Sequence, residues 1–198
     1  EVMEGVVTDP KQFVSEKVGD LIFHFKAGEF FQNNPFILPK LVEYVVQQAD
    51  GDQHALLVDA YCGGGLFGLS AASHFDQVVG IEVSREGFEG ARTNAQLNNI
   101  QNAQFFLGDA SSIFEEIKGF SGKTALVIDP PRRGCDPDFL RQAIAFSPNR
   151  IVYVSCEPAT QARDAQVLVE AGYQAIQAQP FDLFPQTRHV ENVLTLVK

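Results

Sequence analysis

The sequence has only three cysteines, and none has a partner at the spacing of a metal or redox motif. Cys62, Cys135 and Cys156 are odd in number and far apart. Disulfide frameworks, zinc sites and iron–sulfur clusters need paired or clustered cysteines, so this pattern argues against all three, and we expect no bound metal. Unpaired thiols favour a reducing intracellular compartment, the cytoplasm first, with the nucleus or the mitochondrion as alternatives.

Long hydrophobic runs are missing as well. No segment is apolar over the roughly 20 residues that a bilayer-spanning helix needs. The start, Glu1-Val2-Met3-Glu4, has neither the basic flank nor the apolar core of a signal peptide. We therefore expect a soluble protein that is not secreted. Because the first residue is glutamate, we also expect either a fragment of a longer chain with further domains upstream or a processed product.

Basic residues are few. The chain has 15 Lys and Arg against 25 Asp and Glu, for a formal net charge of -10. Phosphate contacts need basic groups, so a nucleic-acid ligand would have to be held by a local basic patch or by an upstream domain. The length of 198 residues, 45% of them hydrophobic, fits one globular domain with a full core.

From Ala55 onward, short apolar runs rich in β-forming residues alternate with helical patterns. This alternation is typical of βαβ units, in which helices connect parallel strands. We expect strands at 55–60, 77–83, 103–107, 123–129 and 150–155. Helices should begin near Gly65, Ser84, Ala110, Asp136 and Pro158, with Ser84 and Asp136 as N-caps.

The C-terminal part should close the sheet differently. Only residues 185–189 join the apolar runs 173–184 and 190–197, too few for a crossover helix, so the two runs should form an antiparallel pair. The predicted fold is therefore a Rossmann-like α/β fold with a mostly parallel seven-stranded sheet and a C-terminal antiparallel hairpin.

The N-terminal part is patterned less strongly. An amphipathic helix is expected over 35–48, after an aromatic turn at 30–34. Residues 1–28 should be the end of an upstream domain or a linker. The main domain should then span 29–198.

A glycine-rich turn follows the first predicted strand, in the run Asp59-Ala-Tyr-Cys-Gly-Gly-Gly-Leu-Phe-Gly68. Glycines let the backbone approach a ligand there, and the next helix presents free N–H groups. Glu82, at the end of the second strand, can accept hydrogen bonds from both hydroxyls of a ribose. A nicotinamide dinucleotide and S-adenosylmethionine both fit this pattern, as does a tight structural turn without a ligand.

Two later segments favour S-adenosylmethionine. Asp109, after the third strand, can bond an adenine amino group. Asp129-Pro130-Pro131, after the fourth, is common in methyltransferases that act on bases and has no obvious task in a dehydrogenase.

Cys156 ends the predicted strand 150–155. Ligands of an open parallel sheet bind outside the carboxyl ends of its strands, so Cys156 should face a substrate. The loop Asp129-Pro-Pro-Arg132-Arg133-Gly134 and the C-terminal Glu191 suggest a substrate-holding loop and a base. The structural alternatives are a buried core cysteine, a surface arginine pair and a solvated turn acid.

Six ordered motifs, from about Phe30 to Lys198, resemble the catalytic domain of the RNA 5-methyluridine (uracil-C5) methyltransferases. They are Phe30-Phe-Gln-Asn33, Asp59-Ala-Tyr-Cys-Gly-x-Gly65, Ile81-Glu82, Asp129-Pro-Pro-Arg-x-Gly134, Val154-Ser-Cys-x-Pro158 and Asp182-Leu-Phe-Pro-Gln-Thr-x-His-x-Glu191. Members of this family often carry an upstream RNA-binding domain, which would account for the acidic balance of this chain.

The resemblance implies S-adenosylmethionine as cofactor and RNA as substrate, tRNA first and rRNA as the alternative; we expect a monomer and no membrane partner. It implies that the Cys156 thiolate adds to uracil C6 and that Glu191 removes the C5 proton. The implied cofactor-binding residues are Gln32, Tyr61, Gly63, Glu82, Asp109 and Asp129. The implied substrate-binding residues are Phe30, Gln32, Asp129 and Arg132.

A nucleophilic Cys156 must be partly ionised near neutral pH. We therefore expect its setting to lower the thiol pKa, through Arg132 or the start of the helix after Pro158. Glu157 stands where many family members have asparagine, and its carboxylate would oppose ionisation unless it points away or pairs with an arginine.

Two other functions fit parts of the pattern. A methyltransferase acting on an exocyclic amine would also use Asp129-Pro-Pro but would not need Cys156. An RNA-binding or chaperone module could retain the fold without turnover, and it would have no need of S-adenosylmethionine.

Overall fold

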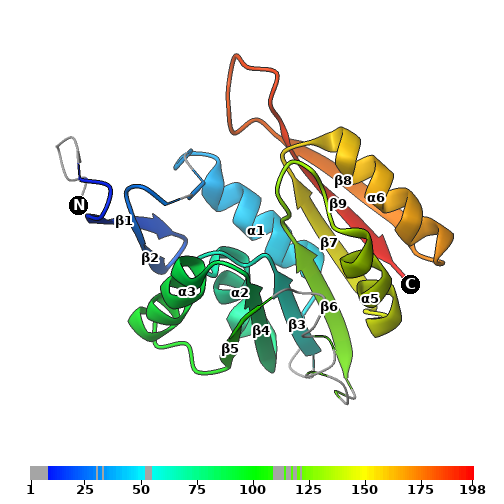
Figure 1. Ribbon diagram of the computed structural model, residues 1–198, viewed down its shortest axis with the longest axis horizontal. Helices are drawn as coiled ribbons and strands as arrows, with labels where there is room; N and C mark the ends of the chain where they lie inside the picture. The colour runs from blue at the N-terminus through cyan, green and yellow to red at the C-terminus, as the bar shows by residue number, and fades with distance from the viewer. Residues whose placement is uncertain are drawn as a thin grey trace.

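The computed structural model describes residues 9–29, 31, 32, 34–51, 55–108, 114, 117, 120 and 122–198. Within them, seven strands form one sheet in the order β5-β4-β3-β6-β7-β9-β8 (Figure 1). Neighbours from β5 to β7 pair in parallel, and β9 pairs antiparallel with both β7 and β8. The strands are β3 (Ala55–Ala60), β4 (Gln77–Glu82), β5 (Ala103–Leu107), β6 (Lys123–Ile128), β7 (Arg150–Ser155), β8 (Gln174–Phe181) and β9 (Glu191–Val197). The predicted sheet is confirmed.

The described helices are α1 (Leu38–Ala49), α2 (Leu66–Ala71), α3 (Arg85–Leu97), α5 (Pro137–Phe146) and α6 (Pro158–Glu170), with a short 3-10 turn, η1 (Ala72–His74). Both predicted N-caps are confirmed. The Ser84 hydroxyl accepts a hydrogen bond from Gly87 N, and the Asp136 carboxylate accepts one from Asp138 N. The helix expected near Ala110 lies outside the described residues.

Helix α1 begins later than the predicted 35–48 segment. Asn34 Oδ1 accepts hydrogen bonds from the backbone N–H groups of Phe36 and Ile37, at 3.1 and 3.2 Å. Such local bonds hold the backbone in a turn and compete with helix formation. The regular helix therefore starts at Leu38.

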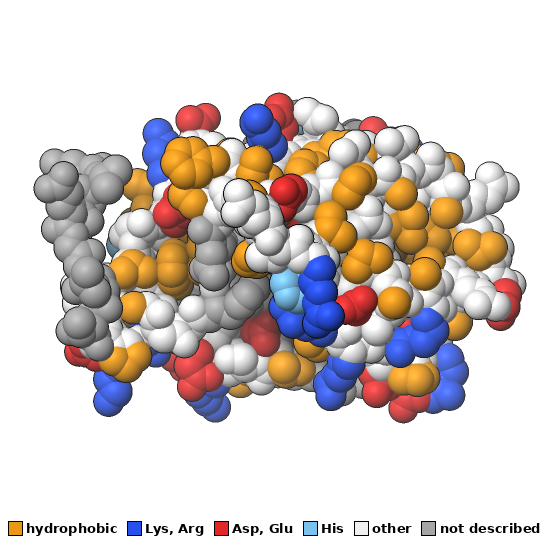
Figure 2. Space-filling view, turned by 90° about the horizontal axis from the view of Figure 1, so that it is seen from above, with side chains coloured by type: hydrophobic (Ala, Val, Ile, Leu, Met, Phe, Trp, Pro, Cys, Tyr) orange, Lys and Arg blue, Asp and Glu red, His pale blue; other side chains and the backbone are white. Residues whose placement is uncertain are grey.

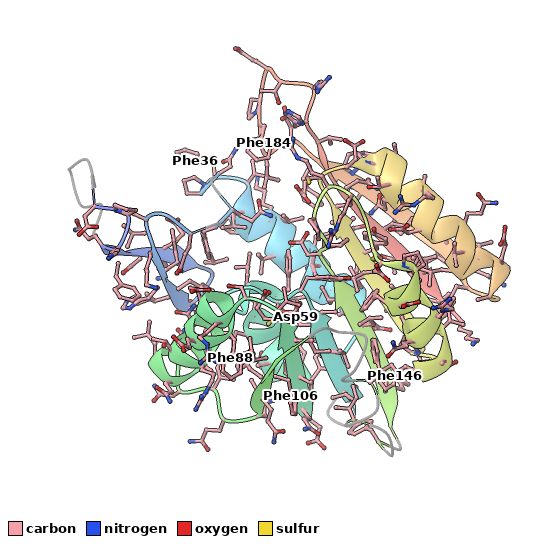
Figure 3. The ribbon with its side chains drawn as sticks, in the orientation of Figure 1. Phe36, Asp59, Phe88, Phe106, Phe146 and Phe184 are labelled. Carbon is pink, nitrogen blue, oxygen red and sulfur yellow. The ribbon has the colours of Figure 1, made fainter. Side chains whose placement is uncertain are left out.

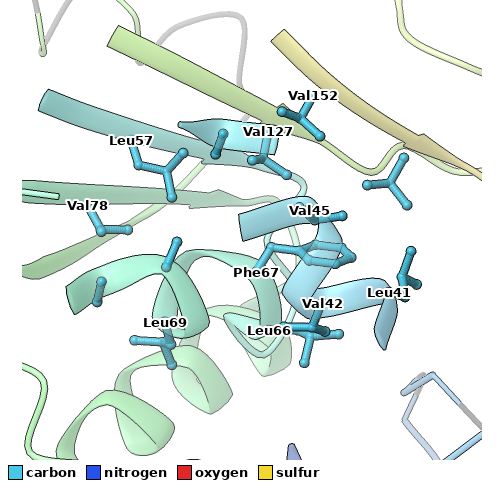
Figure 4. Packing of buried hydrophobic residues seen from close by; sticks show 14 of the residues in the cluster. Leu41, Val42, Val45, Leu57, Leu66, Phe67, Leu69, Val78, Val127 and Val152 are labelled. Atoms are coloured by element: carbon cyan, nitrogen blue, oxygen red, sulfur yellow. The ribbon is translucent and has the colours of Figure 1, made fainter. Parts of the chain in front are cut away.

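The sheet is buried on both faces. Side chains on β3 alternate: Leu57 packs into the cluster formed with α1 and α2, whereas Leu56 and Val58 pack into the cluster formed with α5 and α6. Figure 4 shows the first cluster, with Leu41, Val42 and Val45 of α1 beside side chains of α2 and the strands. Burial on two sides explains why the parallel strands are almost continuously apolar in sequence.

The N-terminal segment forms a hairpin that packs on the main sheet's helices. Strands β1 (Phe13–Val18) and β2 (Leu21–Lys26) pair antiparallel. Phe23 is fully buried in the main core, and the Asn98 side chain bonds both backbone groups of Ile22. The hairpin therefore packs against α3. The division of the chain into residues 1–28 and 29–198 stays a prediction.

The described helices are all too short or too polar to cross a membrane. The carboxyl ends of β3, β6 and β7 point toward one edge of the sheet, from which the β8–β9 connection projects (Figure 1). Ligands of open α/β sheets bind at this edge, so the candidate site is sought there.

Candidate active site

The strand register brings Cys156 and Glu191 to the same edge. Cys156 follows β7 directly, and Glu191 is the first residue of β9, which runs antiparallel to β7. Ser155 pairs with Asn192, so the end of β7 lies opposite the beginning of β9. Because β9 runs antiparallel to β7, its first residue, Glu191, lies at the carboxyl ends of the parallel strands although it is far from them in sequence.

Glu191 has the environment of a base that works near neutral pH. Its side chain is 2% exposed, and among the described residues its Oε1 is a buried oxygen with no hydrogen-bond partner. Burial raises the pKa of Glu191 from 4.5 to about 7, and the positive charge of Arg132 opposes this rise. A carboxylate with a pKa near the working pH is suited to proton abstraction.

The burial of Glu191 should also show in the pH dependence of stability. Its folded pKa lies above its unfolded value, so its contribution is fully present below about pH 4.5 and is lost as the pH rises through about 7. We expect Glu191→Gln to be more stable than the wild-type chain at pH 8, by up to about 3 kcal/mol at roughly 1.4 kcal/mol per pKa unit. The two should be similar at pH 4. Urea unfolding at both pH values measures this, with the exposed Glu170→Gln as control. A Glu191→Gln variant no more stable at pH 8 than at pH 4, relative to wild type, would contradict it.

Cys156 is partly exposed and lies among charged groups from three segments. The Arg132 side chain hydrogen-bonds the thiol and lowers its pKa. Burial and the negative charges of Glu191 and Asp129 outweigh that effect, so the net shift of the Cys156 pKa is upward. The expectation of a lowered pKa was therefore wrong, because desolvation and two carboxylates oppose the thiolate more strongly than one arginine favours it.

Glu157 contributes to the structure mainly through hydrogen bonds of its backbone groups. It occupies the N-cap position of α6 in an extended conformation, without a side-chain cap bond. Its N–H donates to Ser155 Oγ at 3.1 Å. The acids that raise the Cys156 pKa are instead Glu191 and Asp129, which come from other strands.

Asp129 is affected by acids from both parts of the site, Glu191 beside the nucleophile and Asp59 at the glycine-rich turn. Its carboxyl pKa is raised well above the usual range by burial, and then by the charges of Glu191 and Asp59. The Asp129 N–H donates to Ala60 O at 3.4 Å, which ties the end of β6 to the end of β3. A protonated carboxyl both donates and accepts, so it can bond a partner that presents one donor and one acceptor.

The glycine-rich turn is held by two acids. Asp59 Oδ2 accepts from Gly68 N at 2.7 Å and so holds the start of the next helix against the end of β3. Figure 3 shows Asp59 near the middle of the molecule, by the end of β3. Glu82 Oε2 accepts from Gly63 N and Oε1 accepts from Ser84 N, both at 2.8 Å. Burial, together with the Glu82 charge, raises the pKa of Asp59 to about 7 despite the Gly68 bond.

This turn fits a nucleoside-bearing cofactor. Gly63 has φ +51, and a Cβ added there would meet no described atom within 4 Å, so the turn is open on that side. Asp59 Oδ1 is a second buried oxygen that finds no hydrogen-bond partner among the described residues. An ionised carboxylate has about four lone-pair sites, so Glu82 can still accept bonds from ribose hydroxyls.

The other predicted site residues are placed as follows. The Tyr61 ring packs against Phe139 of α5 at 5.3 Å between centroids, and Tyr61 has φ 64. Gln32 is buried at 8% exposure. Its neighbour Asn34 donates to Leu183 O at 3.0 Å and so ties this segment to the β8–β9 connection. Phe30 and Asp109 lie outside the described residues.

Asn94 is a residue that sequence reasoning missed. It is 1% exposed on α3, its Nδ2 donates to Gly64 O at 3.0 Å, and its Oδ1 accepts from His24 N at 2.8 Å. It therefore links the glycine-rich turn to the β1–β2 hairpin. The signal was weak: Asn94 and Asn98 lie four apart on one helix face, but paired polar residues on a helix are usually solvated.

Aromatic and basic side chains surround the site edge. Phe36 is 84% exposed, and Phe184 packs edge-on against His189 at 6.4 Å between centroids. Figure 3 places Phe36 and Phe184 on the same side of the molecule. Seen from above, Lys and Arg side chains gather beside a histidine near the middle of this face (Figure 2). Exposed aromatics with basic groups are typical of surfaces that bind single-stranded nucleic acid.

A solved structure relates this geometry to a known class of enzyme. The Pyrococcus abyssi tRNA (uracil-54, C5)-methyltransferase, in complex with S-adenosyl-L-homocysteine, superposes with a TM-score of 0.82 and 33% sequence identity over 94% of this chain and 45% of that one. The fold is shared more distantly by M. jannaschii TYW2 in complex with AdoMet, at a TM-score of 0.65 and 16% identity over 98% of this chain and 88% of that one. The fold is that of a Rossmann-like S-adenosylmethionine-dependent methyltransferase.

Sequence comparison identifies the family to which this chain belongs within that class of enzymes. The family described as tRNA (Uracil-5-)-methyltransferase matches residues 9–198, and this chain belongs to that family. The tRNA (uracil(54)-C(5))-methyltransferase of Schizosaccharomyces pombe is 47% identical over 98% of this chain and 39% of its own length. The enzyme of the same description from Saccharomyces cerevisiae is 41% identical over 94% of this chain and 31% of its own length. The chain thus spans less than half the length of these relatives.

Proposed function

We propose that this chain is the catalytic part of an S-adenosylmethionine-dependent enzyme that converts uridine to 5-methyluridine in RNA, with tRNA as the substrate. The observation that carries the proposal is the meeting of Cys156, Arg132 and Glu191 at the carboxyl edge of the sheet. A nucleophile and a base at one edge are the two groups that methylation of a pyrimidine carbon requires.

Cys156 is proposed to act first, as the nucleophile that adds to uracil C6. Uracil C5 is a poor nucleophile until a thiolate adds to C6, which makes C5 an enolate carbon. The Arg132 side chain, which hydrogen-bonds the Cys156 sulfur, favours the thiolate against the opposing burial and carboxylates. When bound, S-adenosylmethionine would supply the electrophilic methyl group: its methyl–sulfonium bond would break as C5 forms the new bond, and S-adenosylhomocysteine would leave.

Glu191 completes the sequence. Its buried carboxylate takes the proton from C5, the C6–S bond then breaks, and the Cys156 thiolate is released as the ring regains its double bond. Asp129 and Gln32 are proposed to bond the imide edge of the flipped base and so to select uracil over cytosine. Phe30 is proposed to pack against the base.

The cofactor is proposed to lie over the glycine-rich turn. Gly63 lets the backbone approach it, Glu82 accepts from its ribose, and Asp109 bonds its adenine amino group. Tyr61, Gln32 and Asp129 are the further proposed cofactor contacts. Because Glu82 also holds Gly63 N, one side chain would both shape the turn and bind the ribose.

The domain organisation, oligomeric state and cellular compartment are proposed on the same basis. We propose that residues 29–198 form the catalytic domain of a longer protein that acts as a monomer in a reducing intracellular compartment. Residues 1–28 would connect it to an RNA-binding part upstream. The acidic charge of -10 supports this division, because polyanion binding would then depend on basic surface elsewhere.

Loss of Glu82 should weaken cofactor binding. We expect Glu82→Ala to raise the dissociation constant for S-adenosylmethionine by about 10- to 100-fold, since hydrogen bonds to a charged group contribute about 1.5–3 kcal/mol. Isothermal titration calorimetry measures this. Glu89→Ala is the control, because Glu89 pairs only with exposed Arg85 among the described contacts. Equal affinity of Glu82→Ala and Glu89→Ala would contradict the assignment.

The proposed activity is tested with an unmodified tRNA transcript and S-adenosylmethionine labelled in its methyl group. Nucleoside analysis of the product should place the label in 5-methyluridine. Label in a base methylated on an exocyclic amine would instead identify the alternative reaction class. Cofactor binding without any transfer, on tRNA and rRNA transcripts alike, would contradict the proposal for this chain.

A further inference from the structure

Helix α6 begins two residues after Cys156, and its first turns carry polar side chains that face inward. Gln161 is 2% exposed. Its Nε2 donates to Tyr153 O at 2.7 Å and to Asn192 O at 3.1 Å, and its Oε1 accepts from Asn192 Nδ2 at 2.6 Å. Because Asn192 is next to Glu191, this one side chain ties the strand end that carries the base to β7 and to α6.

Thr160 makes a second link from the same turn of α6. Its hydroxyl lies 3.0 Å from Arg132 O and 3.0 Å from Glu157 O. Arg132 O belongs to the loop after β6, and Glu157 O belongs to the segment after Cys156. The Thr160 hydroxyl therefore connects the backbone of the Arg132 loop to the backbone that follows Cys156.

Asp164, one turn further along α6, holds the rest of the arginine loop. It is 1% exposed; its Oδ2 accepts from Cys135 N at 2.8 Å and from Tyr153 OH at 2.7 Å. Its Oδ1 accepts from Arg163, whose guanidinium also donates to Arg133 O at 2.9 Å.

Gly134 makes this approach of loop and helix possible. Its φ is +81, and a Cβ there would lie 2.6 Å from Asp164 Oδ2 and 2.5 Å from the Arg163 guanidinium. Any other residue would therefore be strained at this φ and would displace the Asp164 and Arg163 side chains from their places between loop and helix.

We infer that Thr160, Gln161 and Asp164 are positioning residues, through which α6 holds Arg132 and Glu191 in fixed places around Cys156. The inference rests on the proposed function for its chemical meaning. Three segments distant in sequence are each bonded to one helix that starts beside the nucleophile. Misplacement of a reacting group by about 1 Å can reduce a rate by about 100-fold.

The two links predict defects in different steps. Loss of the Thr160 hydroxyl loosens Arg132, whose bond favours the thiolate of Cys156. Loss of Gln161 loosens the strand end that carries Glu191, so proton removal should suffer while addition continues. A purely structural role for these side chains would reduce all steps together, in proportion to lost folding.

The first measurement is the pH profile of Cys156 alkylation by iodoacetamide. We expect Thr160→Val to slow alkylation at pH 8 by about 3- to 10-fold and to move the profile to higher pH, as an upward pKa shift of about half a unit to one unit requires. Thr160→Ser, which keeps the hydroxyl, should match the wild-type chain. Cys156→Ala gives the background from buried Cys62 and Cys135. A wild-type profile for Thr160→Val would overturn the link to Arg132.

The second measurement is the covalent adduct with a tRNA transcript and S-adenosylmethionine on a denaturing gel. We expect Gln161→Met to turn over about 10- to 100-fold more slowly and to accumulate adduct, whereas Thr160→Val should accumulate none. Gln166→Ala is the control, since Gln166 is exposed on α6 and bonds only Glu170 among the described contacts. Slow turnover of Gln161→Met without adduct would overturn the link to Glu191.

Thermal unfolding of each variant separates these defects from loss of folding. If Gln161→Met does not fold, Asn192→Ala removes the same side-chain bond from the other partner and takes its place. Failure of the proposed function would appear differently, as a wild-type chain that forms neither adduct nor 5-methyluridine. Alkylation needs no RNA, so it tests the hold on Arg132 even in that case.

Discussion

Cys156→Ala is expected to reduce the formation of 5-methyluridine by about 10⁴-fold or more, which is the scale on which enzymes lose rate with their nucleophile. Without the thiolate, nothing adds to uracil C6, and C5 stays too electron-poor to take a methyl group. Cofactor binding should remain, because Cys156 is not part of the glycine-rich turn. Transfer of labelled methyl to a tRNA transcript, with calorimetry of cofactor binding alongside, measures both.

Cys135→Ala is the matched control for this substitution. Cys135 is also a free cysteine, 5% exposed, and its sulfur contacts only Tyr153 OH among the described hydrogen bonds. We expect this variant to keep methyl transfer within about 10-fold of wild type. A methyltransferase acting on an exocyclic amine would lose little rate with Cys156→Ala, so full activity of that variant would refute the mechanism.

Glu191→Gln is expected to trap the enzyme on its RNA. Glutamine has nearly the same shape but cannot accept the C5 proton, so addition and methylation should proceed while release does not. Overall turnover should fall by about 10²- to 10⁴-fold. A denaturing gel should show a band of RNA joined to protein, with the methyl label in that band.

Two variants separate this outcome from less specific effects. Cys156→Ala combined with Glu191→Gln should give no band, because the adduct needs the thiolate. Glu157→Gln should give no band either, since Glu157 lies beside the nucleophile but contributes mainly backbone bonds. Release of 5-methyluridine by Glu191→Gln at the wild-type rate would assign the base to another group.

The local features of the fold could be predicted because their causes are local. Strand β3 occupies 55–60 and β5 occupies 103–107, as their apolar runs indicated. Ser84 and Asp136 cap their helices because a short polar side chain can reach N–H groups two or three residues ahead. The connection before β9, expected at five residues and nine residues long in the structure (182–190), is too short for a crossover helix, so the final strand is antiparallel and brings Glu191 to the site.

The electrostatics of the site could not be predicted in the same way. Arg132 does favour the Cys156 thiolate, as expected from the sequence, yet Glu191 and Asp129 and the burial of the sulfur reverse the net shift. The order of residues along the chain does not show how deeply a side chain is buried or how near a charge from another strand lies. The start of α1 was misplaced for a smaller reason, the side-chain bonds of Asn34.

The sequence by itself determined the alternation of strands and helices and the glycine turn with its acids, and it predicted Cys156 and Glu191 as the reactive pair. These follow from patterns of two to four residues and from motifs that carry their own chemistry. Only the tertiary structure decided the raised pKa values of the thiol and the acids, and the hydrogen bonds that join α6 to the segments carrying Arg132 and Glu191. The physical reason is that burial and hydrogen bonding between distant segments exist only once the chain has folded and excluded water from the site.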